Sequence, residues 1–300
     1  MPTPSHLAPT APDTALIFEG GGMRGSFTSG VINALLEAEV FCGWVGGISA
    51  GSSCLVNYVS RDPVRSRRSF VDIVTDPQFG GLRTWLRGKG MFHSDWIYEQ
   101  TSDPGQFLPL DYDTFLNNPA QVRVGGFRCR DGRMFHWGRD ELQPKLQLMR
   151  KVRASSTMPL LMPVTEIDGE DFVDGALGPS GGIALDAAQQ DGFDKFLVVF
   201  TRPRGYRKPP VRLPAALTAL FRRYPEVARA LLARPANYNR TLDELLELER
   251  QGRAYLLFPE TMPIENSERD IAKLGAVFDS GLTQARRETP AIREFLGLAV

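Results

Sequence analysis

A serine between two glycines stands at Gly47-Ile48-Ser49-Ala50-Gly51. This G-x-S-x-G pattern is typical of a nucleophile elbow, a sharp turn between a strand and a helix that exposes a serine hydroxyl for attack on a carbonyl carbon. Glycine is needed on both sides, because a side chain there would collide with the neighbouring backbone. Ser49 is therefore the candidate nucleophile. The alternative is that it only caps a helix, a role that serine often has.

A serine nucleophile needs a base, and the histidines are poorly placed to supply it. The α/β-hydrolase order is serine, acid, histidine, but His6, His93 and His136 all precede the candidate acid Asp174. A triad would need its acid between Ser49 and a later histidine, where no motif supports one. A carboxylate within hydrogen-bond reach of the hydroxyl can accept the proton directly, so a serine–aspartate dyad would need no histidine. The Asp-Gly pair at 174–175 is otherwise an ordinary turn signal.

A glycine-rich segment at 20–25 could stabilise the negative charge that such a reaction creates. Consecutive glycines let the backbone approach a substrate closely, and one N–H aimed at the oxyanion contributes about 3 kcal/mol. Arg24 would add a positive charge there or form a structural salt bridge. The predicted oxyanion hole comprises Gly20, Gly21, Gly22, Met23, Arg24 and Gly25.

The same glycines also fit the G-x-G-x-x-G fingerprint of dinucleotide-binding proteins. A nucleotide-binding oxidoreductase of the Rossmann type is therefore an alternative function. That fingerprint expects an acidic residue at the end of the next strand, to bind a ribose hydroxyl. The next apolar run ends at Ser49 with no acid there, which makes this alternative the weaker one.

The elements that must position these residues follow from the apolar pattern. Strands at 15–18 and 41–48 are each followed by a tight turn and a helix, at 27–36 and 50–59, which predicts a parallel sheet with crossover helices. A hairpin is expected at 122–127 and 133–137 around Asp131-Gly132. Further strands are predicted at 170–173, 195–201 and 254–258, and further helices at 142–155, 183–190, 213–233, 241–251 and 267–288. The fold class is α/β, with a central, mostly parallel sheet flanked by helices and a C-terminal helical extension.

The sequence resembles the patatin-like phospholipase family in four linked blocks. They are the G-G-G-x-R-G loop at Gly20–Gly25, the elbow at Gly47–Gly51, a proline block from Ala154 to Pro163 and the acid motif Asp174-Gly175-Ala176. The resemblance implies a Ser49–Asp174 dyad, an oxyanion hole in the glycine loop and hydrolysis of acyl esters without a metal or other cofactor. The segment at 178–182 departs from the family pattern, which bears on the shape of the acyl pocket. A lipid-binding scaffold without turnover is a further alternative.

Composition bounds the remaining expectations. Equal numbers of acidic and basic residues, 35 of each, leave no excess of positive charge of the kind that nucleic-acid binders show. We expect a disordered leader at 1–13, a catalytic core at 14–202 and C-terminal helices and a strand at 203–300 packed on the core. The expected location is the cytoplasm, and the expected substrate a lipid or small ester; oligomeric state is not predicted.

A basic stretch at 202–235 stands out against this neutral background, with nine basic residues and one acidic residue. Its leucines recur at helical spacing, so a basic amphipathic helix could rest on anionic lipid. The slightly favoured alternative is a helix packed on the core by its apolar stripe. We also expect that the region at 61–121 covers the site.

Overall fold

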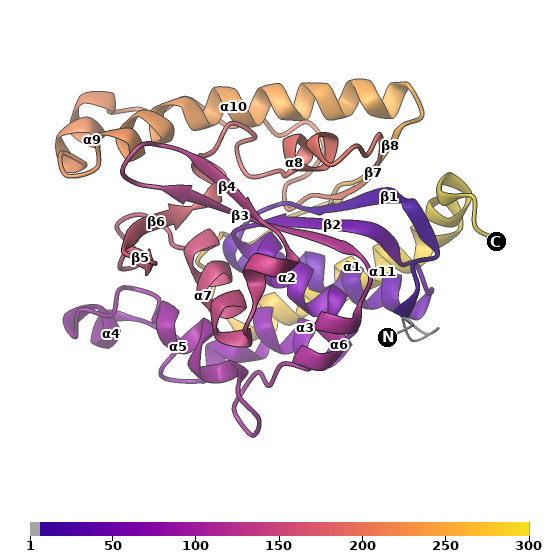
Figure 1. The fold of residues 1–300 in the computed structure, drawn as a ribbon, viewed down its shortest axis with the longest axis horizontal. Coiled ribbons are helices and arrows are strands. Elements are labelled where there is room, and N and C mark those ends of the chain that lie inside the picture. Colours follow the sequence, from indigo (N-terminus) through magenta and orange to yellow (C-terminus); the bar gives the residue numbers. More distant parts are fainter. Residues whose placement is uncertain (1–6, 300) are drawn as a thin grey trace.

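The computed structural model describes residues 7–299, and within them an eight-stranded sheet forms the centre of the molecule (Figure 1). The strand order is β5-β6-β3-β2-β1-β7-β8, and β4 pairs with β3. The strands β3, β2, β1, β7 and β8 run parallel to one another. Strands β4 and β6 each pair with β3 in antiparallel fashion, and β5 pairs with β6 in the same way. The bounds are β1 (Ala11–Phe18), β2 (Cys42–Ile48), β3 (Gln121–Arg128), β4 (Met134–Trp137), β5 (Thr165–Ile167), β6 (Glu170–Asp174), β7 (Lys195–Val199) and β8 (Ala254–Leu257). The predicted mostly parallel α/β fold is confirmed.

Helices cover both faces of the sheet, as parallel strands require. Side chains along β1 alternate between the faces: Ile17 packs with α8 and α10, and Leu16 and Phe18 pack with α1 and α2. Figure 1 shows these two helical layers above and below the sheet. The helices are α1 (Gly25–Glu37), α2 (Ala50–Val59), α3 (Pro63–Phe70), α4 (Leu82–Leu86), α5 (Ser94–Tyr98), α6 (Tyr112–Asn117), α7 (Lys145–Ser155), α8 (Leu185–Gln190), α9 (Pro214–Leu220), α10 (Pro225–Arg250) and α11 (Ile271–Leu296).

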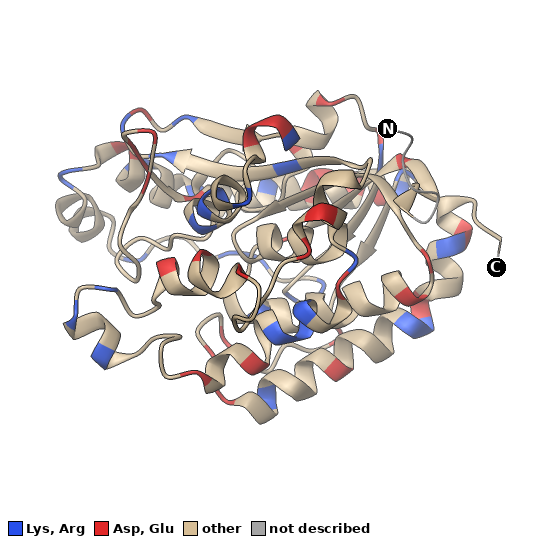
Figure 2. Ribbon diagram, turned by 60° about the horizontal axis from the view of Figure 1, so that its bottom comes forward, with Lys and Arg blue, Asp and Glu red and all other residues tan. Residues whose placement is uncertain are grey.

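The C-terminal region is built into this architecture. Strand β8 extends the sheet beside β7, α10 covers one face, and α11 packs against α1 on the other. The α1–α11 contact is very close, because a Cβ on Gly30 would lie 2.2 Å from the carbonyl oxygen of Phe278, and one on Gly281 would lie 2.2 Å from that of Phe27. Acidic and basic residues are interspersed along the ribbon (Figure 2).

Several predicted boundaries differ from the observed ones. The leader predicted at 1–13 is wrong in its C-terminal half, because Leu7 is buried and β1 already begins at Ala11; residues 1–6 lie outside the described part of the chain. The helices predicted at 213–233 and 241–251 are instead the short α9 and the continuous α10. Pro225 occupies the first turn of α10, where its missing N–H costs nothing.

The final helix lies later than predicted. It begins at Ile271, because the carboxylate of Asp270 accepts hydrogen bonds from the N–H groups of Ala272 and Lys273, and it ends where Gly297 adopts a left-handed conformation. The expected strand pair around 131–132 is present as the antiparallel β3 and β4. Strand β5 was not predicted.

Candidate active site

Ser49 occupies a strained turn between β2 and α2. Its φ angle is 59° and ψ is −130°, a backbone conformation that is costly for a residue with a side chain. The flanking glycines permit the turn, because a Cβ on Gly47 would lie 2.1 Å from the carbonyl oxygen of Gly51, and one on Gly51 would lie 2.1 Å from that of Phe18. The Ser49 hydroxyl makes no helix-capping hydrogen bond. Ser49 therefore has the geometry of a nucleophile elbow and not of an ordinary cap.

Asp174 is the hydrogen-bond partner of this serine. The Ser49 hydroxyl donates to Oδ2 of Asp174 over 2.7 Å, and both side chains are buried. Oδ1 of the same carboxylate accepts the N–H of Ala176 at 2.8 Å, and the N–H of Asp174 donates to the carbonyl of Thr157 at 2.9 Å. Asp174 therefore both forms a turn with Gly175 and contacts Ser49, because one carboxylate oxygen accepts the N–H of Ala176 and the other accepts the serine hydroxyl.

Burial raises the pKa of Asp174 above the ordinary range for aspartate, because it disfavours the charged form. The opposing influences are, in decreasing order, the charge of Arg234, the hydrogen bonds from the Ala176 N–H and the Ser49 hydroxyl, and the charge of Lys208. The net effect makes the carboxylate a better proton acceptor than a solvated aspartate.

His93 and His136 lie beside carboxylates other than Asp174. His93 lies 3.1 Å from a carboxylate oxygen of Asp95, and His136 lies 3.9 Å from that of Asp186. Burial lowers the pKa of His136. No histidine among residues 7–299 hydrogen bonds with Ser49, and His6 lies outside the described residues.

The glycine-rich loop connects β1 to α1 and packs directly on the elbow, since a Cβ on Gly20 would lie 2.9 Å from the Cβ of Ser49. Four of its six candidate N–H donors already have acceptors within the protein. Gly20 donates to Gly182, Met23 to Asn266, Arg24 to Gly21, and Gly25 to Gly22 and Met23. Within the described chain, the N–H groups of Gly21 and Gly22 have no acceptor. Of the six residues expected to form the oxyanion hole, only Gly21 and Gly22 therefore have a backbone N–H available for a substrate.

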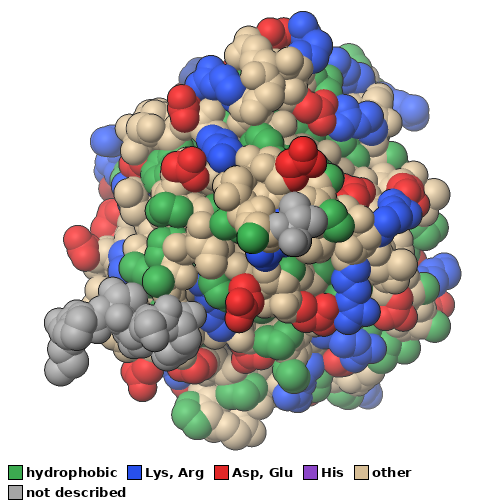
Figure 3. Space-filling model, turned by 90° about the vertical axis from the view of Figure 1, so that its right-hand side faces the viewer, with side chains coloured by type: hydrophobic (Ala, Val, Ile, Leu, Met, Phe, Trp, Pro, Cys, Tyr) green, Lys and Arg blue, Asp and Glu red, His purple; other side chains and the backbone are tan. Residues whose placement is uncertain are grey.

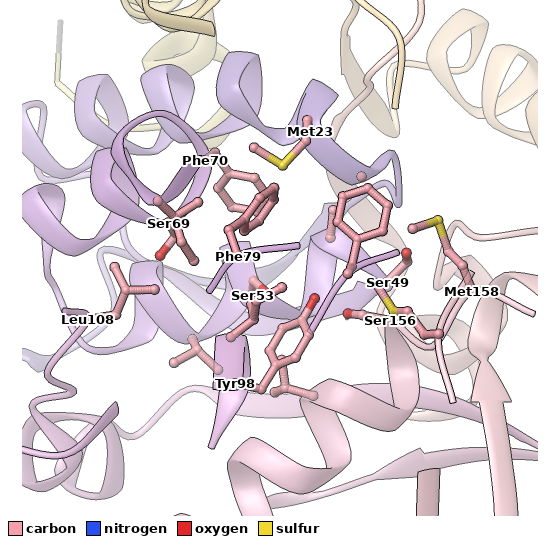
Figure 4. A pocket seen from close by; sticks show the side chains of 18 of the residues that line it. Met23, Ser49, Ser53, Ser69, Phe70, Phe79, Tyr98, Leu108, Ser156 and Met158 are labelled. Atoms are coloured by element: carbon pink, nitrogen blue, oxygen red, sulfur yellow. The ribbon is translucent and has the colours of Figure 1, made fainter. Parts of the chain in front are cut away.

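An apolar cavity of about 70 Å³ opens from Ser49. Figure 4 shows aromatic, methionine and serine side chains around it, with Ser49 at one end. The region at 61–121 forms much of its wall. The lining includes Met23, Phe70, Phe79, Phe92, Ile97, Tyr98, Leu108, Met149, Met158 and Met162.

A second cavity, polar and basic, lies on another side of Ser49 and Asp174. Its basic residues are Arg24, Arg202, Lys208 and Arg234, and Gly21, Gly22, Tyr238 and Asn266 complete much of the wall. Five of these residues were not predicted as site residues from the sequence: Arg202, Lys208, Arg234, Tyr238 and Asn266. The basic stretch at 202–235 was the signal that could have found three of them.

Asn266 links the C-terminal region to the glycine loop. Its carbonyl oxygen accepts the N–H of Met23 at 2.9 Å, and a Cβ on Gly22, whose φ is +57°, would lie only 2.4 Å from that oxygen. Glycine is therefore required at position 22 both by its conformation and by the closeness of the backbone. The loop is held from its outer side by a residue far along the chain.

An α/β fold with a serine elbow, a buried carboxylate partner and a glycine loop defines a class of acyl-transferring hydrolases. A patatin-like phospholipase domain matches residues 16–184, and a domain of unknown function, DUF6363, matches residues 224–297. The chain belongs to the patatin-like phospholipase family.

Two individual proteins are similar to this chain. The uncharacterized protein YjjU of Escherichia coli (strain K12) is 29% identical over 210 residues; the match covers 67% of this chain and 55% of YjjU, so the chain spans little more than half of that relative. VipD from Legionella pneumophila is 13% identical with a TM-score of 0.44, over 92% of this chain and 67% of VipD.

No cluster of three or more His, Cys, Asp or Glu side chains suited to a metal ion occurs in the described part of the chain. Across the same residues, none of the helices combines the length and apolar character needed to cross a membrane.

The strained elbow depends on a hydrogen bond from its own backbone. The N–H of Ser49 donates to Oγ of the buried Ser155 at 2.9 Å, and Ser155→Ala would leave that N–H buried without an acceptor. We expect a loss of about 1–3 kcal/mol in the free energy of unfolding, measured by urea denaturation. Ser156→Ala is the matched control, since the buried Ser156 hydroxyl has no hydrogen-bond partner among the described residues. Equal effects of the two substitutions would contradict this role of Ser155.

Proposed function

We propose that the protein is a serine acyl-ester hydrolase of the phospholipase A or esterase type, with Ser49 as nucleophile and Asp174 as base. The observation that carries the proposal is the 2.7 Å hydrogen bond from the Ser49 hydroxyl to Asp174, made by a serine with a φ angle of 59° at a nucleophile elbow. Membership of the patatin-like phospholipase family supports the same chemistry.

The reaction would proceed in two halves. Oγ of Ser49 attacks the carbonyl carbon of the ester while its proton passes to Oδ2 of Asp174, and the N–H groups of Gly21 and Gly22 stabilise the resulting oxyanion. Collapse of this intermediate breaks the ester bond, and the alcohol leaves with the proton from Asp174. Water then attacks the acyl-Ser49 ester while Asp174 accepts its proton. Collapse of this second intermediate breaks the bond between the acyl carbon and Oγ of Ser49, Asp174 returns the proton to Oγ, and a carboxylic acid is released.

The two alternative functions are less well supported. A dinucleotide-binding protein has no use for a serine and a carboxylate packed on the glycine loop, and Gly20 of this loop contacts the Ser49 elbow. A scaffold without turnover would not need the strained Ser49 conformation, which costs of order 1–3 kcal/mol.

Ser49→Ala and Asp174→Asn test the proposal directly. We expect hydrolysis of p-nitrophenyl butyrate and of a fluorogenic phospholipid to fall at least about 10³-fold in Ser49→Ala and about 10²–10⁴-fold in Asp174→Asn, because nucleophile and base are lost. Asp168→Asn, which alters an exposed carboxylate in the turn between β5 and β6, is the control and should retain wild-type turnover. Full activity in Ser49→Ala would refute the mechanism, and inactive wild-type protein would favour the silent scaffold.

The pH dependence of kcat/KM on p-nitrophenyl butyrate tests the base. Asp174 must be ionised to accept a proton, and its pKa is raised by burial, so activity should be full above that pKa and lost as the pH falls through it. The acid limb should lie above the ordinary aspartate value of about 3.9. Arg234→Gln should move the limb further upward, since the charge of Arg234 lowers this pKa. A limb that disappears in His136→Gln or His93→Gln would instead identify a histidine base.

A further inference from the structure

The basic cavity beside Ser49 is not explained by ester hydrolysis alone. Its wall contains Arg24, Arg202, Lys208 and Arg234, against the carboxylates of Glu19 and Asp174. Glu19 is already satisfied within the protein, since its carboxylate accepts the N–H of Thr201 at 2.5 Å and the Thr201 hydroxyl at 2.9 Å. These hydrogen bonds come from neutral groups and leave the charge of Glu19 in place, so four cations face two carboxylates and the cavity wall keeps an excess of positive charge.

The donors of these cations are incompletely used. Arg24 is 8% exposed, and its Nε has no hydrogen-bond partner in the described chain; the same is true of Nε of Arg234. Arg24, Lys208 and Arg234 form no ion pair with any described residue, and Arg202 approaches only the exposed Glu265, at 3.8 Å. Buried guanidinium groups without partners are costly, so this arrangement suits an anion that is absent from the protein itself.

Lys208 responds to this environment. Burial, followed by the charge of Arg234, lowers the pKa of its ammonium group to about 8, and Arg24 and Arg202 act in the same direction. Burial likewise lowers the pKa of Arg24, with Arg202 as the next cause. These cations thus repel one another in one small volume, and an anion among them would relieve the repulsion.

The position of the cavity specifies which part of a substrate it would receive. Ser49, Gly22, Met158 and Asn266 line both the basic cavity and the apolar cavity, so the nucleophile lies where the two meet. An ester bound at Ser49 with its acyl chain in the apolar cavity would place its alcohol portion toward the cations. Arginine and lysine donors form strong charge-assisted hydrogen bonds with phosphate oxygens, and phosphate is the anionic group that the alcohol portion of a glycerolipid commonly carries.

We propose that Arg24, Arg202, Lys208 and Arg234 bind a phosphate group on the alcohol portion of the acyl ester, so that the enzyme prefers anionic glycerophosphate esters over neutral ones. The substrate preference rests on the proposed ester hydrolysis, whereas binding of the phosphate group itself does not. Three of the four cations come from the segment at 202–235, outside the 16–184 match to the patatin-like domain. The preference for an anionic head group is therefore contributed by the C-terminal half of the chain.

Binding is tested without turnover, by calorimetry on the Ser49→Ala protein with glycerol 3-phosphate, inorganic phosphate and glycerol. We expect both phosphates to bind and glycerol not to bind. Lys208→Gln and Arg234→Gln, each in the Ser49→Ala background, should weaken binding of glycerol 3-phosphate at least about tenfold, since each removes a charge-assisted hydrogen bond. Arg250→Gln, which alters an exposed arginine at the end of α10 outside the cavity, is the matched control. Unchanged affinity in Lys208→Gln and Arg234→Gln, or no binding to any variant, would overturn the site.

Turnover separates a head-group site from a site for free phosphate. The ratio of kcat/KM for a 1-acyl-glycerol 3-phosphate to that for the monoacylglycerol with the same chain should exceed ten in the wild type. It should fall at least about tenfold in Lys208→Gln, but not in Arg250→Gln. A wild-type ratio near one would overturn the head-group assignment even if phosphate binds. A Lys208→Gln variant in which both substrates slow equally would show that the cations act on the oxyanion. If the wild-type protein does not hydrolyse p-nitrophenyl butyrate, the proposed function itself is refuted.

An independent observation concerns the outer surface near the site. Of the ten large hydrophobic side chains exposed among residues 7–299, seven lie in three segments: Leu82, Trp85 and Leu86 of α4, Leu160 and Leu161, and Leu213 and Leu220 at α9. Figure 1 shows α4 and α9 at the same end of the molecule. On the face seen in Figure 3, apolar side chains are instead scattered among charged ones.

The segment at 158–162 connects these elements. The N–H of Met91, just after α4, donates to the carbonyl of Leu161 at 2.8 Å, and Leu160 lines a cavity together with Leu217 of α9. Met158, at the start of the segment, lines the cavities at Ser49. The segment therefore joins the exposed apolar residues of α4 and α9 to the wall of the candidate site.

The charges around this surface have one sign. Residues 80–90 and 212–223 contain six basic residues and no acidic residue. Five of the six, which are Arg83, Arg87, Arg212, Arg222 and Arg223, form no ion pair with any described residue, whereas Lys89 pairs with Asp95. Exposed leucines and a tryptophan flanked by arginines are typical of surfaces that bind an anionic bilayer.

We infer that this surface docks on anionic lipid bilayers, with α4 and α9 inserting their apolar side chains. Co-sedimentation with phosphatidylcholine vesicles, with and without phosphatidylglycerol, tests it. We expect binding only to the mixed vesicles, weakened by salt, and at least about tenfold weaker in the Leu213→Ser/Leu220→Ser double variant. Val64→Ser removes an equally exposed side chain elsewhere on the molecule and should bind as the wild type does. Equal binding by both variants, or binding to neutral vesicles alone, would overturn the docking surface.

Discussion

The hydrogen bond between Ser49 and Asp174 is the interaction on which the site depends, and it joins residues 125 positions apart. The parallel sheet makes this meeting possible. Ser49 directly follows Ile48 of β2, which pairs with Gly125 of β3, and Asp174 at the end of β6 pairs with the next residue of β3. Both residues therefore lie at the same end of β3. Ser155 at the end of α7 accepts the N–H of Ser49, and Thr157 accepts that of Asp174. One short segment after α7 therefore aligns both members of the pair.

Much of this could be predicted from sequence, because the governing constraints are local. The elbow at Gly47–Gly51 needs glycines at fixed spacing, and the repeated order of strand, turn and helix predicts a parallel sheet. The boundaries of the last helices were less predictable. Pro225 reads as an internal kink in an apolar pattern, whereas it starts α10, and Pro235 lies within the same helix. Tertiary packing on the sheet decided between these possibilities.

The oxyanion donors and the basic cavity could not be predicted in the same way. Which N–H groups of the loop stay available depends on Asn266, whose carbonyl takes the N–H of Met23, and no pattern near position 23 reveals that contact. The positive charge of the segment at 202–235 is visible in the sequence, but only the fold shows which of its basic residues form ion pairs on the surface and which line the cavity. Arg204 and Arg207 pair with Glu249 and Asp243 on α10, whereas Lys208 and Arg234 turn toward Ser49.

The cations also set the strength of the base. Arg234 and Lys208 lower the pKa of Asp174 and thereby offset part of the increase that burial causes. Without them the carboxylate would accept protons more readily but would be ionised over a narrower range of pH. In the proposed complex a phosphate group would neutralise these charges, and the pKa of Asp174 would rise while the substrate is bound. A substrate with an anionic alcohol portion would then strengthen the base that attacks it, whereas a neutral ester would not. Arg234 and Lys208 would thus couple recognition of the substrate to the chemistry at Ser49.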